Sequence, residues 1–266
     1  MKEENVRKLV RKGYAEAART QGCCCGAEVS EKIGYTKEQL ESVPEGAVRS
    51  FGCGNPVALA SLKEGETVVD LGSGPGLDCF IASKKVGEKG KVIGVDMTPE
   101  MLDRARENLR TSKQKNVEFR LGEIENLPVA DNTADLIISN CVINLSPDKK
   151  RVFDEAFRVL KPGGRLMISD IVLLKELPET IKKNAESYVG CVSGALMKDN
   201  YLRLIENAGF QNVKIVEEMD SGIDEIVNDH PEVKTAMKET KTTPEDAKRF
   251  SDMMIASIRV SGTKPK

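Results

Sequence analysis

The chain has 266 residues, of which 39% are hydrophobic and 31% charged, and its formal net charge at pH 7 is −2. This length allows one large or two small domains with an ample core. The near-neutral charge argues against a nucleic-acid partner, and no stretch approaches the roughly 20 apolar residues that span a bilayer. The N-terminus is charged from Lys2 onward and lacks the apolar region of a signal peptide, so we expect a cytoplasmic protein that binds neither nucleic acid nor membranes.

The first part of the chain predicts one helix followed by a cysteine-rich break. Apolar side chains recur at helical spacing over residues 3–20, with Lys and Arg between them, which indicates an amphipathic helix. Residues 21–26 interrupt it with three consecutive cysteines, Cys23, Cys24 and Cys25.

From about residue 65 the sequence alternates between short apolar strands and helices. Strands are predicted over residues 67–71, 91–95, 117–121, 134–139 and 165–172, with helices over 77–85, 98–110 and 147–160. The run 161–164, Lys-Pro-Gly-Gly, should end the last of these helices before the strand at 165. This rhythm is typical of βαβ units and predicts an α/β fold with a mostly parallel sheet.

After residue 173 the pattern loosens. We expect helices over 178–192 and 198–208, strands over 213–217 and 254–262, and a charged helical or loop segment over 218–250. The single histidine, His230, falls in that segment and is expected to be a solvated loop residue, and one histidine excludes multi-histidine zinc sites.

A glycine-rich loop follows the first strand of the alternating region. The strand reaches Asp70, and Gly72, Gly74 and Gly76 precede the next helix, so backbone N–H groups and a helix N-terminus point to one cleft. The third glycine of the dinucleotide fingerprint is replaced by Leu77, and the loop has no lysine for a nucleoside triphosphate. Asp96, at the end of the second strand, is suited to hold two ribose hydroxyls. Taken alone, the loop could also be a tight turn of any α/β fold.

Three further segments accompany this loop in order: residues 95–98 (Val-Asp-Met-Thr), 122–128 (Gly-Glu-Ile-Glu-Asn-Leu-Pro) and 160–164 (Leu-Lys-Pro-Gly-Gly). With the loop, they resemble class I S-adenosylmethionine-dependent methyltransferases over about residues 65–175. The resemblance implies a Rossmann-like, mostly parallel seven-stranded sheet with helices on both faces. It also implies that S-adenosylmethionine binds at these residues: Asp70, Gly72, Gly74, Gly76, Asp96, Met97, Glu123, Ile124 and Asn140.

Seven cysteines in a reducing compartment are not a disulfide framework, so they are core residues, metal or metalloid ligands, or redox-active thiols. Cys53, Cys141 and Cys191 each stand beside glycine or a strand end, so each could face the cleft. Three thiolates suit a soft three-coordinate centre better than a hard one, and there is no Cys-x-x-Cys pair of the structural-zinc kind. Cys141 alone would be taken for core packing, as Cys79 is.

The cysteine motifs resemble those of the arsenite S-adenosylmethionine methyltransferases. The matching segments are residues 51–56 (Phe-Gly-Cys-Gly-Asn-Pro), 139–145 (Ser-Asn-Cys-Val-Ile-Asn-Leu) and 190–195 (Gly-Cys-Val-Ser-Gly-Ala). The resemblance implies that Cys141 and Cys191 bind trivalent arsenic, with Cys53 as a third ligand or as a thiol that later forms a disulfide. It also places Phe51 beside the cofactor and one functional thiol among residues 23–25.

On this interpretation, residues 1–60 form an N-terminal helical segment with cysteine loops, 61–175 the cofactor-binding core, and 176–266 acceptor-covering helices with the final strands of the same sheet. Arsenite or its thiol adducts would be methylated, and two thiols would reduce the pentavalent product. Cys53 and an N-terminal cysteine are the expected disulfide pair, which thioredoxin or a glutathione-type thiol would reset.

Two other functions fit part of the pattern. A methyltransferase for a small organic acceptor, such as a quinone precursor, would need a general base, and without a histidine before residue 230 Asp170 or another carboxylate would have to serve. A metalloid-binding thiol sensor would bind arsenite without turnover.

Overall fold

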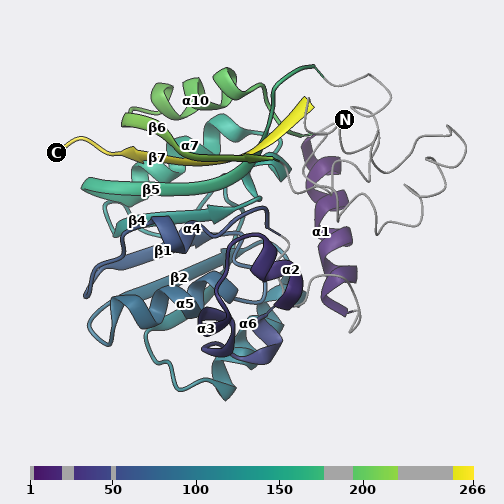
Figure 1. Cartoon of the computed structure of the whole chain (residues 1–266), viewed down its shortest axis with the longest axis vertical. Coiled ribbons are helices and arrows are strands. Elements are labelled where there is room, and N and C mark those ends of the chain that lie inside the picture. The colour runs from purple at the N-terminus through teal and green to yellow at the C-terminus, as the bar shows by residue number, and fades with distance from the viewer. Residues whose placement is uncertain (1–2, 20–26, 49–51, 177–193, 221–253) are drawn as a thin grey trace, which may run out of the picture.

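A computed structural model of the chain describes residues 3–19, 27–48, 52–176, 194–220 and 254–266. Its centre is a seven-stranded sheet in the order β3-β2-β1-β4-β5-β7-β6 (Figure 1). The strands are β1 (Thr67–Leu71), β2 (Lys91–Asp96), β3 (Val117–Leu121), β4 (Ala134–Asn140), β5 (Leu160–Leu173), β6 (Gln211–Asp220) and β7 (Ile255–Thr263). Strands β1 to β5 pair in parallel, and β7 is antiparallel to both β5 and β6. The predicted α/β class with a mostly parallel seven-stranded sheet is confirmed.

Helices cover both faces of this sheet (Figure 1). They are α1 (Glu3–Arg19), α2 (Ala27–Lys32), α3 (Lys37–Glu41), α4 (Pro56–Leu59), α5 (Leu77–Val86), α6 (Pro99–Thr111), α7 (Lys149–Val159) and α10 (Lys198–Asn207), with short 3-10 turns η1 (Glu45–Ala47) and η2 (Ile143–Leu145). One apolar core joins α4, α5 and α6 to the sheet, and another joins α7 and α10 to it. The carboxyl ends of the parallel strands are left for a ligand, as in open α/β sheets generally.

Helix α1 lies across that end of the sheet (Figure 1). Its helical periodicity buries Val6 and Val10 in a small apolar cluster with Cys141 and Leu145. The sequence predicted this helix from its amphipathic pattern, but nothing in the pattern indicated which surface it covers.

The structure differs from the predicted elements at the start of β5. The Lys-Pro-Gly-Gly run was expected to stop a helix before residue 165, whereas β5 begins at Leu160, which pairs with Ala134 of β4. The Gly164 carbonyl accepts a hydrogen bond from the Lys264 N–H at 2.8 Å, so this run stays in the sheet through a register shift. Strand β6 is also longer than expected because it pairs with β7 along most of its length. The predicted helix at 178–192 and His230 lie outside the described residues.

Candidate functional site

A cleft at the carboxyl ends of β1, β2 and β4 gathers most of the predicted cofactor residues. It is lined by α1, the glycine loop, the ends of the strands and the turn after β4. The predicted residues that line it are Asp70, Gly72, Gly74, Asp96, Met97, Ile124, Asn140 and Cys141. Gly76, Glu123 and Cys53 are not among the lining residues, and Phe51, Cys191 and the cysteines at 23–25 lie outside the described part of the chain.

The glycines of the loop share a left-handed backbone but differ in what surrounds them. All three have positive φ angles, of 67° at Gly72, 51° at Gly74 and 101° at Gly76. A Cβ at Gly76 would lie 2.7 Å from Phe119, so this glycine allows the loop to pack on the core. Gly74, in contrast, has no atom within 4 Å of its Cβ position, so here the backbone borders the open cleft. A ligand can therefore approach the loop most closely at Gly74.

Asp96 is held firmly at the end of β2. Its Oδ2 accepts a hydrogen bond from the Gly74 N–H at 2.9 Å, and its Oδ1 accepts one from the Thr98 N–H at 2.8 Å. Burial raises the pKa of Asp96, while these two N–H donors lower it. The carboxylate thus both shapes the glycine loop and faces the cleft, where the sequence placed a ribose-binding acid.

Two further carboxyl groups stand on the same wall of the cleft, Asp70 and Asp78. Burial, and then the charge of Asp78, raise the pKa of Asp70 well above its usual range. The Cys79 thiol donates a hydrogen bond to Asp70 Oδ2 at 3.2 Å. Cys79 is buried, as predicted, but this hydrogen bond was not foreseen. Three acids in one cleft favour a ligand that carries positive charge.

Tyr35 and Asp78 are site residues that sequence reasoning missed. The Tyr35 hydroxyl, which comes from the loop before α3, donates a hydrogen bond to Asp78 Oδ1 at 2.8 Å, and both residues line the cleft. Burial raises the pKa of Asp78 to about 6. The position of Asp78 in the first turn of the helix after the glycine loop was a usable signal, whereas nothing local marked Tyr35.

The segment predicted beside the adenine contributes one of its two predicted residues, Ile124, to the lining of the cleft. Ile124 lines the cleft and is 8% exposed. Glu123 is not a lining residue and instead forms ion pairs with Arg7 at 3.5 Å and with Arg11 at 3.7 Å, both from α1. Glu125 lines the cleft in its place and pairs with Arg7 at 3.3 Å. The acidic side of this segment therefore holds α1 over the cleft.

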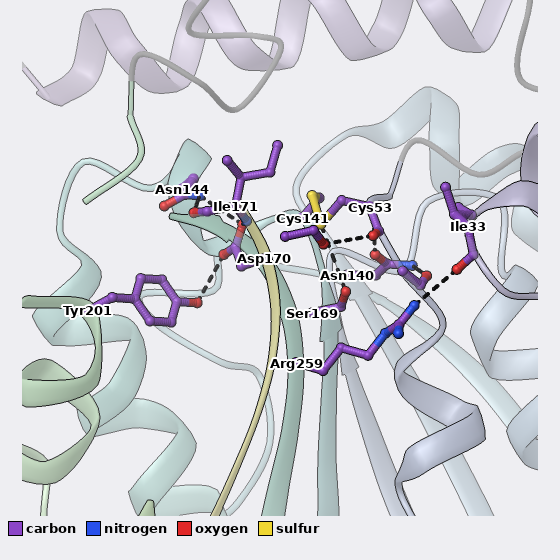
Figure 2. The surroundings of a disulfide bond; sticks show 12 residues. Ile33, Cys53, Asn140, Cys141, Asn144, Ser169, Asp170, Ile171, Tyr201 and Arg259 are labelled. Atoms are coloured by element: carbon purple, nitrogen blue, oxygen red, sulfur yellow. Dashed lines mark hydrogen bonds between the residues drawn. A yellow bond between two sulfur atoms is a disulfide. The ribbon is translucent and has the colours of Figure 1, made fainter. Parts of the chain in front are cut away.

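Two of the predicted thiols meet at the end of β4, where Cys141 lines the cleft. Cys53 and Cys141 form a disulfide with their Cα atoms 5.9 Å apart (Figure 2). Cys141 is 4% exposed and has a φ of 56°, a left-handed conformation that non-glycine residues seldom adopt. Its N–H donates to the Ser169 carbonyl of β5 at 2.8 Å, which fixes the turn that presents the sulfur.

This pairing corrects one expectation. Cys53 was expected to pair with an N-terminal cysteine, but its partner in the structure is Cys141, because the loop before α4 folds directly onto the end of β4. Within the described parts of the chain, no three Cys, His, Asp or Glu side chains cluster as a metal site. The third predicted ligand, Cys191, is outside those parts.

Asp170, the carboxylate considered as a general base, is not among the cleft-lining residues. It is completely buried in β5 and accepts hydrogen bonds from Asn144 Nδ2 at 2.8 Å and from the Tyr201 hydroxyl at 3.0 Å (Figure 2). Burial raises its pKa to about 7. Its contacts indicate a structural role beneath the turn that follows Cys141.

No helix of the described segments is long and apolar enough to cross a bilayer.

Comparisons with known proteins show the family to which this chain belongs. A family model described as a methyltransferase domain matches residues 62–209. An arsenite methyltransferase of Halobacterium salinarum is 47% identical over 230 residues, which are 80% of this chain and 59% of the relative. The arsenite methyltransferase of Homo sapiens is 36% identical over 81% of this chain and 61% of its own length. The chain thus spans about three fifths of these curated relatives.

A solved structure extends the similarity to three dimensions. The crystal structure of an arsenic(III) S-adenosylmethionine methyltransferase from Chlamydomonas reinhardtii superposes with a TM-score of 0.63 and 33% sequence identity, covering 90% of this chain and 73% of that one. With a methyltransferase model over more than half of its length and these relatives beside it, the chain belongs to the class I S-adenosylmethionine-dependent methyltransferases, in the arsenite methyltransferase family.

Proposed function

We propose that this protein transfers methyl groups from S-adenosylmethionine to trivalent arsenic bound by cysteine thiolates. The observation that carries the proposal is the position of Cys141, which lines the same cleft as Gly74 and Asp96 and lies next to Cys53. A soft sulfur pair at one end of a cofactor cleft suits a soft acceptor.

The cleft fits the cofactor in both shape and charge. The space beside Gly74 is open, and the Ser73 hydroxyl is buried without a hydrogen-bond partner among the described residues. When bound, S-adenosylmethionine supplies a methyl group activated by its sulfonium charge. Asp78 and Asp96 would offset that positive charge, and Asp96 would hold the ribose.

The acceptor end of the cleft would bind arsenic through Cys53 and Cys141, with Cys191 as the proposed third thiolate. Arsenic bound by thiolates keeps a lone pair that can accept a methyl group, so no general base is needed. This agrees with the buried position of Asp170 outside the cleft-lining set. Thiolates rather than a disulfide are the binding form, so the Cys53–Cys141 pair must be reduced before arsenic binds.

The disulfide suggests how the product is reduced. Methylation at the lone pair leaves pentavalent arsenic, and two thiols supply the two electrons that restore the trivalent state while they become a disulfide. We propose Cys53 and Cys141 as that pair. Thioredoxin or a glutathione-type thiol would reopen the bond, directly or through one of the cysteines at 23–25.

The test uses the purified, reduced protein with S-adenosylmethionine and a thiol, with and without arsenite. Arsenite-dependent formation of both S-adenosylhomocysteine and methylated arsenic is the expected result. Tight arsenite binding without S-adenosylhomocysteine would instead indicate a thiol sensor. Turnover of an organic acceptor that survives Cys141→Ser would overturn the arsenic assignment.

A further inference from the structure

The loop that carries Cys53 is attached to the sheet by side chains as well as by the disulfide. The Cys53 N–H donates a hydrogen bond to Asn140 Oδ1 at 3.1 Å, and the Cys53 carbonyl accepts one from the Ser257 hydroxyl at 2.9 Å. Asn140 Nδ2 also donates to the Gly54 carbonyl at 2.6 Å. Asn140 ends β4 and Ser257 lies in β7, so both supports come from the sheet.

The glycines on either side of Cys53 are explained by this attachment. A Cβ at Gly52 would overlap the amide group of Asn140, and a Cβ at Gly54 would overlap the Ser169 hydroxyl. Figure 2 shows Asn140 and Ser169 close to the sulfur pair. The absence of side chains at 52 and 54 therefore lets the Cys53 backbone lie directly against these polar groups.

Only a carboxamide makes this set of contacts with one side chain. Asn140 accepts from one backbone group and donates to the next, which an ionised carboxylate cannot do because it has no donor. The same Nδ2 lies 3.0 Å from the Tyr35 hydroxyl, which in turn donates to Asp78. Asn140 thus connects the Cys53 loop with the acidic wall of the cleft.

We propose that Asn140 is the positioning residue for the arsenic-binding thiols. It keeps Cys53 next to Cys141 after the disulfide opens, so that the reduced protein presents a preformed dithiol. Cys141 follows Asn140 directly in the chain, so the side chain that holds the Cys53 loop belongs to the neighbour of the second thiol. This inference rests on the proposed function, which identifies the ligand of the dithiol.

The first test measures how strongly the two thiols are held together. The protein dithiol reacts with glutathione disulfide to give the protein disulfide and two glutathione thiols, so the protein is oxidised and glutathione reduced without a further reactant. In Asn140→Ala, two hydrogen bonds to the Cys53 loop are lost. We expect the equilibrium constant, measured on alkylated peptides that contain Cys53 and Cys141, to fall about tenfold.

Asn116→Ala is the matched control. It also removes two hydrogen bonds from an asparagine side chain to the backbone, those to the carbonyls of Ser83 and Gly87, but leaves every contact of Asn140 and Cys53 in place. Its thiol equilibrium should stay within about twofold of the unchanged protein. An equal fall in both variants, or no fall in Asn140→Ala, would overturn the assignment of Asn140.

A second test needs no variant and so does not depend on a mutant that folds. Hydrogen exchange of the Cys53 amide is compared in the oxidised and the reduced protein. If Asn140 holds this N–H, protection persists after reduction, whereas exchange at the rate of a free amide would contradict the proposal. Neither test measures methylation, so arsenite-dependent S-adenosylhomocysteine formation separately decides the proposed function.

Discussion

Asp170 offers a quantitative test of how burial and charge interact in this fold. Its carboxyl group is completely buried, and the three groups that contact it, Asn144 Nδ2, the Ile171 N–H and the Tyr201 hydroxyl, all donate hydrogen bonds. These donors favour the charged form, but burial outweighs them and raises the pKa from 3.8 to about 7. The ionised carboxylate is therefore less stable in the folded protein than in the unfolded chain.

The sign of the pH dependence follows from this shift. Well below pH 3.8 the Asp170 carboxyl is neutral in both states, and between about pH 4 and pH 7 it is ionised only in the unfolded chain, so folding stability falls as the pH rises. Each pH unit in that range lowers the free energy of unfolding by about 1.4 kcal/mol, and this loss levels off above pH 7. Asp170→Asn keeps the shape of the side chain and removes the ionisation. From pH 5 to pH 8, the free energy of unfolding of this variant should therefore rise by about 3 kcal/mol relative to that of the unchanged protein.

The assay is urea unfolding of both proteins at pH 5 and pH 8, with the Cys53–Cys141 disulfide intact throughout. The difference between the two pH values isolates ionisation, because any packing defect of the asparagine contributes equally at both. A stability difference that stays constant within about 0.5 kcal/mol would refute the reasoning. It would show that the three donors fully compensate the charge of Asp170.

Three further predictions concern the cleft. Gly74→Ala should abolish S-adenosylmethionine binding in calorimetry and lower the melting temperature by only a few degrees, because its Cβ enters the open space of the cleft. Gly76→Ala should mainly destabilise the fold, because its Cβ meets Phe119, and equal losses of melting temperature in the two variants would contradict this prediction. S-adenosylmethionine should bind several-fold more tightly at pH 7 than at pH 5, because Asp78, with a pKa of about 6, gains its negative charge in this range. The affinity for S-adenosylhomocysteine, whose sulfur is uncharged, should change less, and identical pH profiles for the two ligands would exclude the role of this charge. Cys141→Ser should eliminate arsenite-dependent methylation while its affinity for S-adenosylmethionine stays within about threefold of that of the unchanged protein, both measured on reduced protein. Methylation that persists in this variant would show that Cys141 is not an arsenic ligand.

Local sequence was sufficient for the α/β class, for most strand and helix positions, and for the glycine loop with the strand-end acid Asp96, whereas the seven-stranded sheet was expected from the family resemblance. Strand and helix periods depend on which side chains alternate over a few residues, and a left-handed turn such as that at Gly74 is favoured by glycine itself. Local sequence also indicated that two thiols lie near the cleft, because Cys53 is flanked by glycines and Cys141 follows the end of a strand.

Only the tertiary structure determined the contacts between segments that are far apart in the chain. Tyr35 meets Asp78, Arg7 meets Glu125, and Cys53 pairs with Cys141 because the packing of loops on the sheet brings these groups within bonding distance. No local pattern encodes such distances, since they depend on how the whole core fills its volume. For the same reason the burial of Asp170, which displaces its pKa, could be recognised only in the folded molecule.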